Sequence, residues 1–244
     1  MTGEWTCAQA RTTGAKASFT SKRSMSPIGD GLSTRSAARM VSNYQTAFYS
    51  LAIRAKVADD ETVLIFGAGG GLGGALADVA TALGAEVIGV DRTPEKREAA
   101  VRAGCRTVFL ADDDLVQAVR AEAPGGIDVV LDPVGGDLTK SALRLLSPGG
   151  RLVILGFASG SIAAIEANRI LIKNLDVIGS VWGEAVTRDP SLPATIWIQL
   201  TELLASGLIT PPGGPEFPLE RGAEALEGLL QGNLDGRAVL IPPA

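Results

Sequence analysis

The residues best suited to chemistry form a glycine-rich loop. Residues 67–74 read Gly-Ala-Gly-Gly-Gly-Leu-Gly-Gly, with six glycines in eight positions. Backbone without side chains can approach an anion closely, and the amide hydrogens that open a following helix carry partial positive charge. Asp91 stands about 20 residues further on, where a carboxylate can accept hydrogen bonds from ribose hydroxyls. Together they predict a site for the diphosphate and adenosine ribose of a dinucleotide.

Two registers of this loop fit the dinucleotide fingerprint. Residues 69–74 match G-x-G-x-x-G literally, and residues 68–73 match the variant that begins with alanine. We prefer the second register because it begins nearer the expected strand end. A glycine-rich turn without a nucleotide is the alternative interpretation. The loop residues expected to bind the cofactor are Ala68, Gly70, Gly71, Leu72 and Gly73.

Three charged residues bear on the choice between NAD and NADP. Asp91 favours NAD, because its negative charge repels a 2′-phosphate. Arg92 is adjacent and Lys96 lies one helical turn further, and both could pair with that phosphate or be solvated surface charges. The cofactor is therefore NAD or NADP, with NAD favoured by Asp91.

Short apolar runs alternate with amphipathic segments and predict the elements that position these residues. Helical crossovers between the runs imply parallel strands with both faces of the sheet covered. We expect an α/β fold with a doubly wound parallel Rossmann sheet in the order 3-2-1-4-5-6, and a ligand between Gly67 and Asp132 at the tips of strands one and four. The expected strands are Thr62–Gly67, Glu86–Asp91, Arg106–Leu110, Ile127–Asp132, Arg151–Gly156 and Leu175–Trp182.

Capping residues and glycines predict the helix boundaries. Ser42 or Asn43 is the expected N-cap of the helix that precedes the first strand. Thr93 with Pro94 begins a helix after the second strand, and residues 147–150 end the helix before the fifth. Further helices are expected over residues 112–123, Ile165–Lys173, Ile196–Ser206 and Leu219–Gln231.

The composition along the chain predicts four segments. Residues 1–25 are expected to be a disordered leader, with an organelle transit peptide or a foreign or shifted-frame leader as interpretations. Lead-in helices at 26–60 precede a dinucleotide-binding domain at 61–210. Residues 211–244 would be a helix and a strand of an incomplete second domain. The last strand, Arg237–Ile241, has no partner in the expected sheet, so a dimer mate or an absent domain should supply one.

The composition also excludes several classes of function. Without histidine there is no Ser-His-Asp or Cys-His nucleophile and no zinc site that contains histidine. Cys7 and Cys105 cannot build a cysteine-only site, so no metal is expected, and they are typical of reduced cytoplasmic thiols. A net charge of −5 argues against nucleic acid as a partner. No apolar run reaches the roughly 18 residues of a membrane span.

Several spaced segments carry a resemblance to one family. They are Asn43–Phe48, residues 67–74, Asp132–Gly136, Pro148–Arg151, Gly156–Gly160 and Lys173–Leu175. With them the chain, from about Pro27 onward, resembles the zinc-independent branch of the medium-chain dehydrogenase/reductase superfamily, the quinone oxidoreductase and enoyl reductase-like proteins.

This resemblance implies hydride transfer from a nicotinamide to a small-molecule electron acceptor, a quinone or an activated alkene or carbonyl. It implies that Thr46 lies near the nicotinamide end of the cofactor. It also implies a homodimer formed through the edge strand 176–182. Family members begin with a barrel-like domain that carries the proton donors, so no catalytic residue is assigned in this sequence. The remaining cofactor-binding residues that it implies are Pro133, Val134, Gly156, Phe157 and Ala158.

Other functions fit the sequence less well or remain open. A truncated dinucleotide-binding module that binds cofactor without turnover is the main alternative. A short-chain dehydrogenase needs Tyr-x-x-x-Lys, and neither Tyr44 nor Tyr49 has a lysine four residues later. A methyltransferase would not explain the six-strand double winding or the Asp132–Gly136 segment.

Overall fold

The computed structural model describes residues 32–112, 114–210, 212–231, 234 and 237–243. The expected leader at 1–25 lies outside these residues. Contacts divide the chain into two compact units. One is Thr46–Trp182, and the other combines the described parts of Met1–Gln45 and Gly183–Ala244. The expected division placed residues up to 210 with the nucleotide-binding sheet, whereas the contacts end that unit at Trp182.

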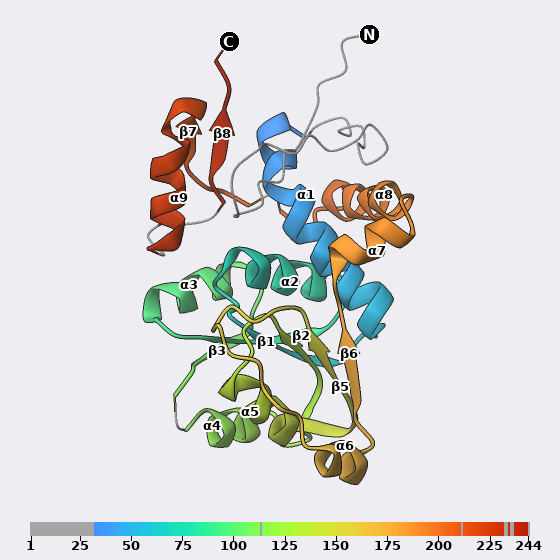
Figure 1. Ribbon diagram of the computed structural model, residues 1–244. Coiled ribbons are helices and arrows are strands. Elements are labelled where there is room, and N and C mark those ends of the chain that lie inside the picture. The colour runs from blue at the N-terminus through green and yellow to red at the C-terminus, as the bar shows by residue number, and fades with distance from the viewer. Residues whose placement is uncertain (1–31, 113, 211, 232–233, 235–236, 244) are drawn as a thin grey trace. The chain divides into compact units, whose positions relative to one another are not determined.

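The Thr46–Trp182 unit is built on a parallel sheet (Figure 1). The described strands form a six-stranded sheet in the order β3-β2-β1-β4-β5-β6. This arrangement confirms the predicted fold class and strand order. Leu64 on the central strand pairs with Ile88 on one side and Val130 on the other, and all three are fully buried. The strands are β1 (Thr62–Phe66), β2 (Glu86–Asp91), β3 (Thr107–Leu110), β4 (Ile127–Asp132), β5 (Leu146–Ile154) and β6 (Asp176–Gly179).

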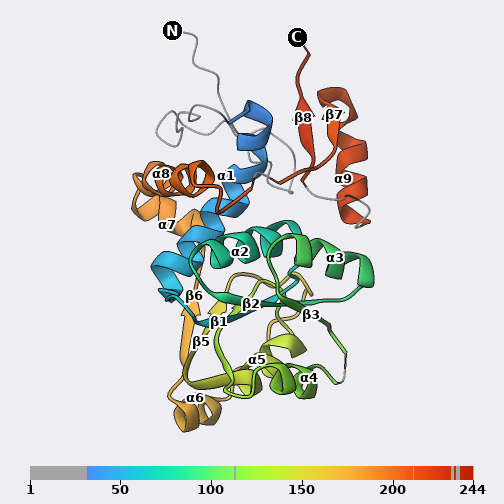
Figure 2. The ribbon, with the colours of Figure 1, turned by 180° about the vertical axis from the view of Figure 1, so that it is seen from behind.

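Helices cover both faces of this sheet. In Figures 1 and 2, α2 (Gly71–Ala82) and α3 (Pro94–Arg102) lie on one face. On the other face lie α4 (Leu115–Glu122), α5 (Asp137–Leu145) and α6 (Ala167–Lys173). Burial on both faces explains why the strands are continuous apolar runs rather than alternating ones. The predicted cap of α3 is confirmed, because the Thr93 side chain accepts the Lys96 amide hydrogen.

The first helix begins earlier than predicted. The helix α1 spans Thr34–Phe48, so the expected caps Ser42 and Asn43 lie inside it. Ser33 takes the capping role, with its Oγ accepting the Ser36 amide hydrogen at 3.1 Å. A π-helix, η2 (Tyr49–Ala55), follows directly. Arg151 fixes its end by donating to the Ala55 carbonyl at 2.6 Å.

The bounds of β5 and β6 differ from the prediction by more than those of the other strands in this sheet. The strand β5 begins directly after α5 and includes residues 147–150, which were expected to end the helix and precede the strand. Its pairing with β4 shifts register between Ile127 and Val129, so the glycines there are accommodated as an irregularity in the strand. The strand β6 ends at Gly179 rather than Trp182, because Trp182 begins the helix α7 (Trp182–Arg188).

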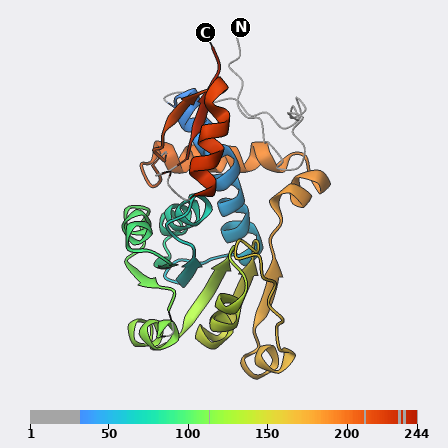
Figure 3. The same ribbon diagram turned by 60° about the vertical axis from the view of Figure 1, so that its left-hand side comes forward.

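The second unit contains the partner of the last strand. The strand β8 (Val239–Ile241) pairs in parallel with β7 (Glu216–Pro218), so this chain itself supplies the partner that was expected from a dimer mate or another domain. Figure 3 shows α9 (Gly222–Leu230) beside this pair, after the short helix η3 (Leu219–Arg221). The buried Arg39 guanidinium donates to the Gly214 and Arg237 carbonyls. The remaining long helix is α8 (Leu192–Ala205).

No helix in the described ranges is long and apolar enough to cross a bilayer.

Candidate functional site

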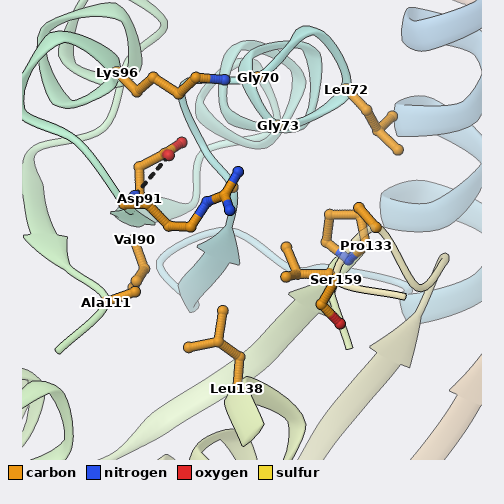
Figure 4. Close-up of a pocket in the computed structure, with 14 residues that line it drawn as sticks. Gly70, Leu72, Gly73, Val90, Asp91, Lys96, Ala111, Pro133, Leu138 and Ser159 are labelled. Atoms are coloured by element: carbon orange, nitrogen blue, oxygen red, sulfur yellow. Dashed lines mark hydrogen bonds between the residues drawn. The ribbon is translucent and has the colours of Figure 1, made fainter. Parts of the chain in front are cut away.

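The site lies at the carboxyl ends of the parallel strands. A pocket of about 290 Å³ opens there, between the glycine loop after β1, the end of β2 and the turn after β4. In an open α/β sheet this is the edge at which ligands bind, where the strand order reverses. In Figure 4, Asp91 and Lys96 lie on one side of the pocket and Pro133 and Ser159 on the other. The expected location between strands one and four agrees with this position.

The glycine loop holds its helix against the end of β1. A Cβ built on Gly73 would lie 2.0 Å from the Gly67 carbonyl oxygen, so any side chain there would displace the backbone. A Cβ built on Gly74 would lie 3.7 Å from its nearest neighbour, the Ala103 Cβ, which is an ordinary van der Waals contact. The glycine required for close packing is therefore Gly73, in agreement with the preferred register 68–73. Ala68 is fully buried and donates its amide hydrogen to the Val90 carbonyl at 3.2 Å.

The amino end of α2 borders the pocket without a capping side chain. Its N-cap is Gly70, in extended conformation, and within the described chain no side chain caps the helix. Amide hydrogens in such a first turn lack intrahelical acceptors and carry the positive end of the helix dipole. This is the arrangement that binds phosphate groups.

Asp91 stands at the end of β2, almost fully buried, with 5% of its surface exposed. Its Oδ2 accepts the Gly69 amide hydrogen at 2.8 Å, and its Oδ1 accepts the Arg92 amide hydrogen at 2.7 Å. The carboxylate thus reaches back to the glycine loop as well as bordering the pocket. Arg92 and Lys96 line the same pocket, so two cationic side chains accompany this anion.

A second carboxylate shapes the opposite wall. Asp132, at the end of β4, is fully buried, and its Oδ1 accepts the amide hydrogens of Val134 at 2.9 Å and Gly135 at 2.8 Å. The loop after β5 is tied to this turn, because Ala158 donates its amide hydrogen to the Pro133 carbonyl at 3.1 Å. The Ser159 backbone amide also donates its hydrogen, to the Val134 carbonyl at 2.9 Å. The wall is therefore a hydrogen-bonded pair of loops.

The structure brings most of the predicted residues to this pocket. Asp132, which holds the Pro133–Gly135 turn, supports the wall without lining the pocket. The predicted residues that line it are Gly70, Leu72, Gly73, Asp91, Arg92, Lys96, Pro133, Val134 and Ala158.

Five predicted residues do not line the pocket. Thr46 lies in α1, where its carbonyl accepts the Ser50 hydroxyl hydrogen at 2.7 Å. Ala68 packs beneath the loop, and Gly71 begins α2. Gly156 lies against the Pro133 carbonyl, and Phe157 is 45% exposed. Ala68, Gly71 and Phe157 are chain neighbours of residues that line the pocket, whereas Thr46 belongs to a different element.

Sequence reasoning missed several residues of the lining. Val90 and Ala111 lie at the ends of strands two and three, and that position at the strand tips, which had already singled out Gly67, was the signal that could have found them. Leu138 is in the first turn of α5, and Ser159 belongs to the Gly156–Gly160 segment. Their types are ordinary for a core or a loop, so residue type alone gave no signal.

Comparisons with known proteins identify the family. The sequence profile of a family described as zinc-binding dehydrogenase matches residues 71–199, more than half of the chain. The chain belongs to this family. It is a member of the medium-chain dehydrogenase/reductase superfamily, in the zinc-independent quinone oxidoreductase branch, as predicted. Among the residues that the structure describes, no group of three or more histidines, cysteines or acids is placed to hold a metal ion.

Individual relatives agree with this placement. Mouse quinone oxidoreductase-like protein 2 is 34% identical over 93% of this chain and 65% of its own length. A mycobacterial quinone oxidoreductase has a TM-score of 0.83 and is 26% identical, covering 90% of this chain and 68% of that one. A mycobacterial protein complexed with NADPH has a TM-score of 0.81 at 26% identity, over 89% and 67% of the two chains. This chain thus spans slightly under two thirds of the length of the mouse relative.

Proposed function

We propose that this chain binds NAD or NADP in the pocket at the strand ends and serves hydride transfer from the nicotinamide to a quinone or an activated alkene or carbonyl. The observation that carries the proposal is the uncapped amino end of α2 facing the pocket, with Gly73 packed where no side chain fits. The names of similar proteins support the reaction: a quinone oxidoreductase and a protein complexed with NADPH. The bound cofactor supplies the hydride.

The residues of the pocket fit the parts of such a cofactor. The first-turn amides of α2 would hold the diphosphate, and Asp91 would accept hydrogen bonds from the adenosine ribose. Pro133, Val134 and Ala158 would form the apolar wall against the nicotinamide. This wall would fix the ring and keep water from one of its faces.

The choice between NAD and NADP is part of the proposal. The Asp91 carboxylate disfavours a 2′-phosphate, whereas Arg92 and Lys96 line the same pocket and favour it. We retain NAD as the favoured cofactor because the buried charge of Asp91 is held at the strand end, whereas Arg92 is exposed to solvent.

A direct test combines binding with turnover. NADH and NADPH are titrated separately into the purified chain, following quenching of tryptophan fluorescence and the shift of the thermal midpoint. Consumption of the reduced cofactor is then followed at its absorbance band with a water-soluble benzoquinone. Saturable binding with quinone-dependent turnover supports the proposal. Binding without turnover would identify the alternative, a dinucleotide-binding module, and no binding of either nucleotide would refute both.

A homodimer formed through β6 is proposed as well. This strand ends the order of the sheet, and the described residues include no strand that pairs with its outer edge. Two-fold pairing of an edge strand with its twin would continue the sheet from one protomer into the next.

A further inference from the structure

We infer that Asp91 is a positioning residue for the glycine loop, in addition to being a ribose acceptor, so that the loop can hold a diphosphate only while this carboxylate is present. The inference rests on the proposed function, because it concerns how the same pocket binds its nucleotide. It differs from the usual role of such a residue, which is to select between NAD and NADP.

The carboxylate joins two backbone segments at the pocket. Its Oδ2 accepts the Gly69 amide hydrogen from the loop after β1, over 2.8 Å, and its Oδ1 accepts the Arg92 amide hydrogen from the turn after β2, over 2.7 Å. Only 5% of Asp91 is exposed, so water competes little for either bond. Hydrogen bonds from amides to an ionised carboxylate are stronger than neutral ones.

A second neighbour closely bounds Gly69. A Cβ on Gly69 would lie 2.1 Å from the Lys96 carbonyl oxygen, so the loop backbone packs directly against the backbone of α3. Gly69 is thus hydrogen-bonded to the Asp91 carboxylate and lies directly against the Lys96 peptide. Gly70, the next residue, is the N-cap of α2, so the position of Gly69 sets where the first-turn amides point.

The surrounding charges allow the two roles of Asp91 to be separated. Arg92 and Lys96 line the pocket, and in the described parts of the chain neither side chain has a hydrogen-bonding or ion-pairing partner. If Asp91 acted only as a filter against a 2′-phosphate, its removal would leave two unopposed cations and NADPH would bind more tightly. If it positions the loop, its removal weakens the binding of both nucleotides.

The test uses Asp91→Ala and Asp91→Asn in the full chain, with NADH and NADPH titrated by fluorescence. We expect Asp91→Ala to weaken both nucleotides by roughly tenfold or more, the effect of losing hydrogen bonds to a charged acceptor. Asp91→Asn keeps an oxygen for the Gly69 amide and loses the charge, so it should shift the preference toward NADPH. Glu95→Gln, an exposed acid in the first turn of α3, is the control for a general charge effect.

A second measurement does not depend on the nucleotide. Amide hydrogen exchange over residues 67–76, in the absence of cofactor, should be faster in Asp91→Ala than in the wild type and nearly unchanged in Asp91→Asn. Tighter NADPH binding by Asp91→Ala, or unchanged exchange in that variant, would overturn the inference. If the wild type binds neither nucleotide while the exchange result stands, the proposed function fails and the positioning role does not.

Discussion

Thr139 donates its hydroxyl hydrogen to the Asp132 carboxylate, with 2.6 Å between Oγ1 and Oδ2. This bond joins the first turns of α5 to the end of β4, and the second oxygen of the carboxylate holds the Val134 and Gly135 amides. Asp132 is fully buried, and Thr139 is 4% exposed. The wall of the pocket after β4 therefore depends on one buried anion whose donors all come from this short segment.

Replacing Asp132 should destabilise the protein far more than replacing Thr139. Asp132→Ala leaves two buried amides and a hydroxyl without their acceptor, and we expect it to lower the free energy of unfolding by about 3 kcal/mol or more. Thr139→Val removes one bond at nearly constant shape and should cost about 1 to 2 kcal/mol. Urea unfolding followed by circular dichroism measures both. Equal losses in the two variants would contradict the arrangement.

Two neighbouring glycines should respond differently to the same substitution. A methyl group on Gly73 would lie 2.0 Å from the Gly67 oxygen, so Gly73→Ala must displace the loop from the start of α2. We expect it to weaken nucleotide binding by roughly 100-fold or to prevent folding, in proportion to the strain of an overpacked core.

Gly74→Ala is the matched control. Its methyl group would lie 3.7 Å from the Ala103 Cβ, and alanine in a helix interior is favoured over glycine by up to about 1 kcal/mol. This variant should bind nucleotide like the wild type and melt at an equal or higher temperature. If Gly74→Ala were the damaging change, the literal register 69–74 would be the correct one.

The sheet could be predicted from the sequence because its strands carry strong local signals. Glu86–Asp91 and Ile127–Asp132 have the predicted bounds, since each is an apolar run with a glycine shortly before it and an acid at its end. Thr93 and Pro94 fixed the start of α3 in the same way. The order of the strands was that of the dinucleotide-binding fold, and right-handed crossovers placed helices on both faces of the sheet.

Weak local signals account for the elements that were missed. The strand β7 has three residues and contains Pro218, so no period could identify it as the partner of β8. In the first turns of α1 the buried residues are Ala37 and Met40. A small side chain such as that of alanine is a weak sequence signal for the buried face of a helix, so the start of α1 was missed. In the site, Val90, Ala111 and Leu138 are apolar residues whose position at the pocket depends on tertiary structure. Which residues contact a bound cofactor stays a prediction.

Cys105 should make stability fall at alkaline pH. Burial raises the pKa of its thiol from 9.0 to about 12. Below pH 9 the thiol is neutral in the folded and unfolded states, so it has no effect on stability there. Between pH 9 and 12 only the unfolded thiol ionises, and the free energy of unfolding should fall by about 1.4 kcal/mol per pH unit.

The comparison that isolates this effect uses Cys105→Ala, with both proteins carrying Cys7→Ser. Urea unfolding from pH 8 to 11 should show a steeper loss with Cys105 present than with alanine in its place. In the native state at pH 8, a disulfide reagent should leave the Cys105 thiol unmodified until the protein is unfolded. Parallel pH profiles for the two proteins would mean that the thiol ionises equally well in the folded state.

The outer edge of β6 gives a specific test of the proposed dimer. The Ser180 amide donates to the Ile154 carbonyl in β5, and amides alternate in direction along a strand, so the Val177 amide hydrogen points away from β5. Val177→Pro removes this outward donor and leaves the pairing with β5 in place, while Val177→Thr keeps it. Light scattering should give the mass of a dimer for the wild type and Val177→Thr, and of a monomer for Val177→Pro. A monomeric wild type, or a dimeric proline variant, would show that β6 does not form the interface.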